Sequence, residues 1–133
     1  MTDNFFTELS EWKTMIQKGL TTFVEVPLEW GEEEQRSECH PWSTSPDIYF
    51  FKTVCGIRPV TPGYTTVVIE PQLGTIKKLN AVFPHPLGKI EMNLVIDNGS
   101  LSGTITVPQG MDAAFKWKGK EQKLTQGKQR VEL

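Results

Sequence analysis

The side chains best suited to chemistry lie in residues 19–59, a stretch that connects two helical patterns. It contains Glu25, His40 and two tryptophans, Trp30 and Trp42, among several further carboxylates. Large aromatic side chains gain nothing in a solvated connector, whereas a sugar-binding cleft uses them as flat apolar walls beside hydrogen-bonding carboxylates. The mixture of residues therefore indicates a functional site, and a carbohydrate cleft is a kind of site that it suits.

The same stretch does not have the pattern of a metal or disulfide site. The three glutamates at 32–34 favour a solvated loop tip, because adjacent carboxylates rarely converge on one ion. Glu38, Cys39 and His40 are adjacent too, so in an extended chain their side chains point to opposite sides. Cys39 and Cys55 are too few for a disulfide scaffold or an all-cysteine zinc site. We therefore expect no metal and no cofactor.

The composition is that of a folded domain. The chain has 133 residues, of which 38% are hydrophobic, and this is enough for a core. No window approaches the roughly 18 apolar residues of a transmembrane helix. The N-terminal sequence MTDNFFTELSEW has neither the basic start nor the apolar run of a signal peptide. These features predict no membrane partner and, by default, a cytoplasmic location.

Charge is divided unevenly along the chain. Residues 1–57 carry 10 acidic and 4 basic residues, whereas residues 58–133 carry 6 acidic and 10 basic residues. Opposite signs favour docking of the two segments on one another, and neither has the strong basic excess of a nucleic-acid-binding protein. Nucleic acid is therefore not an expected partner.

Two helices are predicted on either side of the candidate site. Apolar residues recur at spacings of three and four up to Gly19, where the first helix ends, and an extended segment then carries Glu25. Residues 43–47, Ser-Thr-Ser-Pro-Asp, suit the start of a second helix, which Gly56 ends. The apolar stripes comprise Phe5, Leu9, Trp12, Ile16 and Leu20 in the first helix and Ile48, Phe51, Val54 and Cys55 in the second. Together the two helices form an αα-hairpin.

The remainder of the chain has the period-two pattern of β-strands. In residues 89–97 apolar and polar side chains alternate, and Asn98-Gly99 then favours a type I′ hairpin. The predicted strands are residues 65–70, 77–83, 89–97, 101–107, 113–118 and 129–133. The predicted fold is α+β, with a helical hairpin over residues 1–57 and an antiparallel β-sandwich or jelly-roll-like domain over residues 58–133.

Three segments carry a resemblance to a known family. In order and spacing, GLTTFVEVPLEW, RSECHPWSTSPDIYF and TVCGIRPVTPGYTTVVIEPQLG resemble the C-terminal region of bacterial α-L-rhamnosidases. The resemblance implies the last helices of a six-hairpin α/α barrel, which carries the active site in that family, followed by a C-terminal β-sandwich. It also implies that the chain is part of an inverting glycoside hydrolase that acts on rhamnose-containing glycans.

The resemblance further implies roles for single residues. Glu25, in TTFVE, looks like the general base of the family, and His40, in SECHPWS, looks like a residue that contacts the rhamnose hydroxyls. Trp42 and Trp30 are candidate walls of the sugar site. The chain departs from the family pattern at Val24, where tryptophan is usual, and near Trp42 at the preceding proline, where a small residue is common.

A base alone does not make an inverting hydrolase. The reaction needs a second, protonated carboxyl roughly 6.5–9.5 Å from the base. In the family this acid lies upstream in the barrel, and no segment of this sequence matches it. We therefore expect the isolated chain to be inactive or nearly so. Two alternatives stay open: a carbohydrate-binding or accessory module without catalysis, and a structural remnant that forms homo-oligomers through exposed helix faces.

Overall fold

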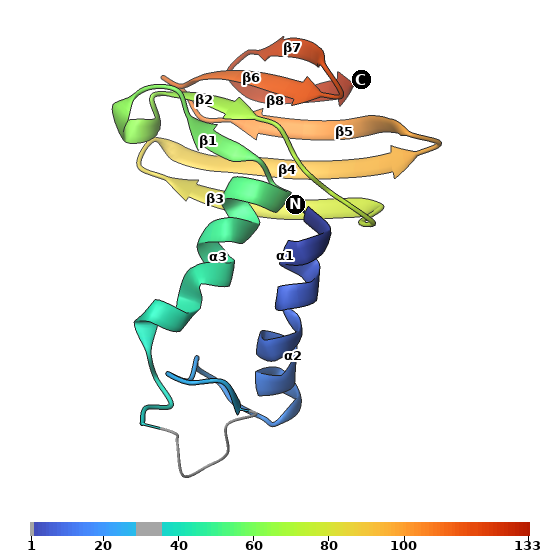
Figure 1. Ribbon diagram of the computed structural model, residues 1–133. Helices are drawn as coiled ribbons and strands as arrows, with labels where there is room; N and C mark the ends of the chain where they lie inside the picture. Colours follow the sequence, from blue (N-terminus) through green and yellow to red (C-terminus); the bar gives the residue numbers. More distant parts are fainter. Residues whose placement is uncertain (1, 29–35) are drawn as a thin grey trace. The chain divides into compact units, whose positions relative to one another are not determined.

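The computed structural model of the protein describes residues 2–28 and 36–133. The chain forms two compact units, Met1–Phe50 and Phe51–Leu133. Helices make up the first unit, and two β-sheets make up most of the second (Figure 1). This is the predicted α+β class, with a β-sandwich that follows helices. The assignment of residues 1–57 to the end of a barrel stays a prediction.

The first predicted helix is present as two consecutive segments, α1 (Thr2–Glu8) and α2 (Ser10–Gln17). Helical hydrogen bonding continues across the intervening Leu9, whose amide donates to the Phe5 carbonyl at 3.1 Å and whose carbonyl accepts from the Lys13 amide at 3.0 Å. The two segments therefore act as one helical rod with a slight irregularity at Leu9.

The rod ends at the predicted glycine. Gly19 has a φ of 79°, which is readily adopted by a residue without Cβ. The Gly19 amide donates to Ile16 O and the Leu20 amide to Met15 O, both at 3.0 Å. This pair of bonds is a Schellman motif, which satisfies the last helical carbonyls and turns the chain toward Glu25.

The buried side of α2 differs from the predicted stripe. Met15 is 5% exposed, whereas Ile16, which lies on the predicted apolar stripe, is 75% exposed. Trp12 and Met15 are three residues apart and share one face, so they form the side that packs within the helical unit. A four-residue spacing places Ile16 on the apolar stripe but does not fix which of two neighbouring apolar residues faces the interior.

The second helical stretch has three successive kinds of winding. It begins as the 3₁₀ helix η3 (Pro41–Thr44), continues as α3 (Ser45–Tyr49) and ends as the π-helical turn η4 (Phe50–Val54). Gly56 follows with a φ of 68°, as expected for a helix stop. Thr44 occupies the N-cap of α3, but its hydroxyl donates to the Pro41 carbonyl at 2.6 Å instead of accepting a helix amide. No described helix has the length and apolar character needed to cross a membrane.

The second unit is built from two four-stranded sheets. One sheet has the order β1-β2-β6-β7 and the other the order β3-β4-β5-β8. Between β1 and β2 lies the short 3₁₀ helix η5 (Pro62–Tyr64). The strands are β1 (Ile57–Pro59), β2 (Thr66–Ile69), β3 (Lys78–His85), β4 (Gly88–Asp97), β5 (Ser100–Val107), β6 (Asp112–Trp117), β7 (Lys120–Leu124) and β8 (Gly127–Glu132).

The core of the sandwich follows from the alternation along the strands. Side chains on the inner faces are buried, and they alternate with outward polar side chains as a half-buried sheet requires. Phe115 is fully buried at the centre of β6. The inner faces contribute Ile57, Val67, Ile69, Ala113, Phe115 and Leu124 from one sheet and Leu79, Ile90, Met92, Leu94, Leu101, Ile105, Val107 and Val131 from the other.

Pairing between the strands is mostly antiparallel, with one exception. Asn98 and Gly99 join β4 to β5 with φ angles of 47° and 84°, which confirms the predicted I′-type hairpin geometry. β2 and β6, in contrast, pair in parallel. Three of the four strands of the other sheet, β3 to β5, lie between β2 and β6 in the sequence, so the pairing requires a long connection that a local pattern does not predict.

Candidate active site

Glu25 lies where two segments of the first unit run beside each other in opposite directions. The Glu25 amide donates to Ser37 O at 2.9 Å, and the His40 amide donates to Phe23 O at 2.7 Å. The Thr22 hydroxyl bonds to the Glu38 carbonyl in the same ladder. These bonds fix Glu25 and His40 on neighbouring strands of a short pairing, although the two residues are far apart in the sequence.

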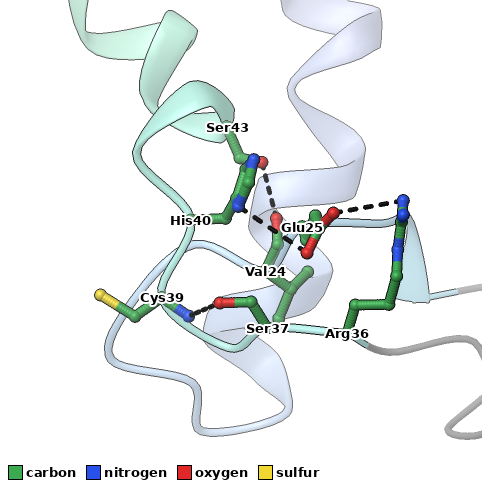
Figure 2. A network of polar contacts seen from close by, with 7 residues as sticks. All are labelled: Val24, Glu25, Arg36, Ser37, Cys39, His40 and Ser43. Atoms are coloured by element: carbon green, nitrogen blue, oxygen red, sulfur yellow. Dashed lines mark hydrogen bonds and ion pairs between the residues drawn. The ribbon is translucent and has the colours of Figure 1, made fainter.

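The helices hold this pairing in place from both sides. The hydroxyl of Ser43, in η3, donates to the Val24 carbonyl at 2.6 Å (Figure 2). The indole nitrogen of Trp12, in α2, donates to the Ser43 carbonyl at 2.9 Å. Glu11, also in α2, accepts a hydrogen bond from the Leu28 amide at 2.8 Å. The backbone on each side of Glu25 is therefore tied to α2 or η3.

The Glu25 carboxylate lies between two basic side chains. Its Oε1 is 3.2 Å from Nη2 of Arg36, and its Oε2 is 3.8 Å from Nδ1 of His40. Figure 2 shows both side chains directed at the carboxylate. The Glu25 side chain is 21% exposed, and Arg36 is 71% exposed. The carboxylate is thus partly shielded, held at one oxygen by Arg36, and still reachable by water.

His40 and Trp42 differ in their surroundings. The side chain of His40 is 29% exposed, and its ring makes an edge contact with the Trp42 ring at a centroid distance of 5.9 Å. Trp42 is 89% exposed, so it presents nearly its whole ring to solvent. Such an exposed ring beside a carboxylate and an imidazole has the composition of a sugar-binding wall.

The remaining candidate residues are placed as follows. Trp30 and the glutamates at 32–34 lie outside the described residues. Val24 is buried, at 2% exposure, so it forms no wall of an open site. Cys39 is exposed, and its sulfur points away from Glu25 in Figure 2. Within residues 2–28 and 36–133, no three histidine, cysteine, aspartate or glutamate side chains are grouped as a metal site would require.

Arg36 is the residue that sequence reasoning did not single out. It lies 11 positions from Glu25, and no helical or strand periodicity relates the two. Its contact with Glu25 depends on the pairing of residues 23–25 with residues 37–40, which is a tertiary feature. The available signal was that Arg36, the first residue of RSECHPWS, is a lone base in a segment otherwise rich in acids.

The arrangement can accept a proton from a water molecule. A carboxylate with one oxygen anchored by a guanidinium retains a second oxygen for a nucleophilic water, and the adjacent imidazole can orient a hydroxyl group. An arginine, a carboxylate, an imidazole and an exposed indole are also a hydrogen-bonding and stacking set for a polyhydroxylated ligand.

Comparisons with known proteins relate the chain to one family. Residues 56–132 match the family model described as the bacterial alpha-L-rhamnosidase C-terminal domain. A search among curated proteins found no match to the chain.

Solved structures of alpha-L-rhamnosidases share the fold of this chain. The Streptomyces avermitilis alpha-L-rhamnosidase complexed with L-rhamnose is 22% identical, with a TM-score of 0.75 over 92% of this chain and 14% of that one. Native alpha-L-rhamnosidase from Aspergillus terreus is 19% identical, with a TM-score of 0.74 over 92% of this chain and 15% of that one. The enzyme from Dictyoglumus thermophilum is 25% identical, with a TM-score of 0.63 over 77% of this chain and 12% of that one. The chain therefore spans 12% to 15% of the length of these structures.

Proposed function

The chain belongs to the family of bacterial α-L-rhamnosidase C-terminal domains, and from this premise we propose that it is the C-terminal part of an inverting hydrolase of terminal α-L-rhamnosides. The observation that supports this proposal most directly is the geometry of Glu25, a partly shielded carboxylate held between Arg36 and His40. In the proposed reaction Glu25 accepts the proton of the attacking water, and His40 and Trp42 contact the sugar.

The protonated carboxyl that the mechanism also requires belongs to another part of the parent enzyme. Inversion needs the two carboxyls roughly 6.5–9.5 Å apart with a water between them. The proposed role of this chain is therefore the base side of the site, and the chain by itself has little or no activity on natural glycosides. Its expected partner is a rhamnose-containing glycan in the context of the whole enzyme.

An activated substrate tests the role of Glu25 in the isolated chain. Nitrophenolate departs without protonation, so nitrophenyl α-L-rhamnoside relaxes the need for the absent acid. We expect the chain at high concentration to hydrolyse nitrophenyl α-L-rhamnoside slowly, with release of nitrophenol. It should not hydrolyse methyl α-L-rhamnoside, because the methanol leaving group needs the acid. The Glu25→Gln variant keeps the shape of the side chain but not its basicity, so its rate should be about 100-fold lower.

A matched control separates this role from general damage to the site. Glu8→Gln changes an exposed carboxylate of the same helical unit, in α1, and it should leave the rate nearly unchanged. Equal rates for the unaltered chain and Glu25→Gln would refute the assignment of the base. Retention of configuration in the sugar product would refute inversion.

A further inference from the structure

The outer face of the β1-β2-β6-β7 sheet contains a hollow of about 500 Å³, unrelated in its residues to the Glu25 site. Its volume falls within the range of about 300–1,000 Å³ that is usual for small-ligand sites. The whole hollow lies within the second unit, Phe51–Leu133. The sheet presents this face away from the sandwich core, so the hollow opens outward.

The hollow exists because the two middle strands carry small side chains there. The strand register aligns Arg58 of β1, Val68 of β2, Ala114 of β6 and Lys123 of β7 in one row across the sheet. Strands are about 4.8 Å apart, so the two long cationic side chains flank the row from opposite edges, about 14 Å apart at the backbone. Between them Val68 and Ala114 form a low apolar floor.

Paired charges form part of the rim. Arg58 is bonded to Glu70, and Nζ of Lys116 is 3.0 Å from Oε2 of Glu121. Each partner is 40% to 55% exposed, so these pairs are presented to solvent and have hydrogen-bonding capacity left over. The first pair joins Arg58, in the segment GIRP, to Glu70, in the segment IEP, and the candidate active site uses neither segment.

Two further groups on the rim have unused capacity. Within residues 2–28 and 36–133, neither the Asp112 carboxylate nor the Lys123 ammonium forms an ion pair. Asp112 lies two residues before Ala114 on β6, and Lys123 is the partner of Ala114 on the adjacent strand β7, so both groups border the Ala114 end of the floor. With three acids and three bases around it, the hollow has no net charge, so it selects neither an anion nor a cation.

From this geometry we propose that the hollow is a second carbohydrate site, which binds a neutral 6-deoxysugar at the end of a glycan. The charged rim donates to and accepts from ring hydroxyls, and the Val68–Ala114 floor receives the methyl group that replaces a sugar hydroxymethyl group. The choice of a 6-deoxysugar rests on the proposed function, whereas the preference for a neutral polyhydroxylated ligand rests on the hollow alone. The site would hold a product or substrate end on the sandwich.

Amide chemical shifts of the whole chain provide the test. During titration with L-rhamnose, we expect saturable shifts at Val68, Ala114 and Lys123, separate from any shifts at Glu25 and His40. L-Mannose differs from L-rhamnose by the hydroxyl at C6, which would face the apolar floor, and should bind several-fold more weakly.

Variants locate the ligand. Ala114→Arg fills the hollow and should abolish the shifts in β2, β6 and β7 without altering those at Glu25. Ser102→Arg is the matched control, because Ser102 is also a small, half-buried outward residue on a middle strand, in the other sheet. If Ala114→Arg unfolds the chain, the double variant Asp112→Asn with Lys123→Ala, which changes only exposed side chains, should weaken binding at least fivefold.

The outcomes are distinct from those that test Glu25. Saturable shifts confined to residues 23–40 would overturn the second site and leave the proposed function standing. Saturable shifts in the sheet with no activity on nitrophenyl rhamnoside would overturn the proposed function and leave the second site standing. Absence of saturable shifts at Val68, Ala114 and Lys123, or shifts there that persist unchanged in both sets of variants, would overturn the proposal.

Discussion

The two thiols of the chain lie in opposite environments, and this difference predicts their reactivity. Cys55 is fully buried next to Gly56, and burial raises the pKa of its thiol to about 12. Cys39 is exposed. Because the thiolate is the reactive form, iodoacetamide at pH 8 should modify Cys39 and leave Cys55 unmodified for as long as the chain stays folded. In concentrated urea both should react, and mass spectrometry of peptides reads out each site.

Cys39 serves as the internal control for that experiment, since its modification shows that the reagent is active. Modification of both thiols at similar rates in the native chain would contradict the burial of Cys55. The comparison also tests the join between η4 and β1, because local opening of this segment would expose Cys55 before the whole sandwich unfolds.

At the scale of single residues, the sequence indicated part of the site. The clustering of Glu25, His40 and Trp42 in one loop was a compositional signal, and the structure brings the first two to 3.8 Å and the last two into ring contact. Their chemical roles stay a prediction. Arg36 was not foreseen, because its position opposite Glu25 is set by backbone bonds between residues distant in sequence.

At the scale of elements, the connection between η4 and β1 requires a glycine at position 56. Its φ is 68°, and a Cβ at this position would lie 2.0 Å from the Glu70 carbonyl oxygen. The Gly56 carbonyl also accepts a hydrogen bond from the Glu70 amide at 3.0 Å. Gly56→Ala should therefore lower the free energy of unfolding by at least about 3 kcal/mol in urea denaturation, because both the backbone angle and the close approach are violated.

Gly63 is the matched control for this prediction. It has a similar φ of 71°, but a Cβ there would meet no atom within 4 Å. Gly63→Ala should cost only the conformational penalty of about 1 kcal/mol. Equal losses in the two variants would show that the contact with Glu70 carries no energetic weight.

The elements that the sequence predicted are those with a local signal. Strand β4 alternates apolar and polar residues over its length, and the Asn98-Gly99 turn fixes its partner. β1 and β7 were missed, because β1 has three residues and includes a proline, and β7, KEQKL, has one apolar residue. Both are edge strands, which pair with a single neighbouring strand of the sheet. The parallel pairing of β2 with β6 follows from tertiary packing, and a period-two pattern carries no information about it.

At the scale of the whole molecule, the helical unit presents large apolar side chains to solvent. Ile16, Trp42, Ile48 and Tyr49 are 53% to 89% exposed. An apolar hollow of about 370 Å³ also opens between the α1–α2 rod and α3, lined by residues that include Phe5, Trp12 and Tyr49. The chain spans 12% to 15% of the length of the rhamnosidase structures that it resembles. Exposed apolar surface of this kind favours association.

We therefore predict that the isolated chain self-associates through its helical unit, as one alternative reading of the sequence already suggested. Burial of each large apolar side chain contributes about 1.5–3 kcal/mol, so a few such contacts suffice for a weak dimer. Sedimentation velocity should show a sedimentation coefficient that rises with concentration. The double variant Ile16→Lys with Trp42→Ser should sediment as a monomer over the same range, whereas Val82→Lys, which alters an apolar side chain 51% exposed on the sandwich, should leave the association unchanged. A chain that stays monomeric at every concentration would refute self-association. Loss of association only in Val82→Lys would show that the contact surface lies on the sandwich.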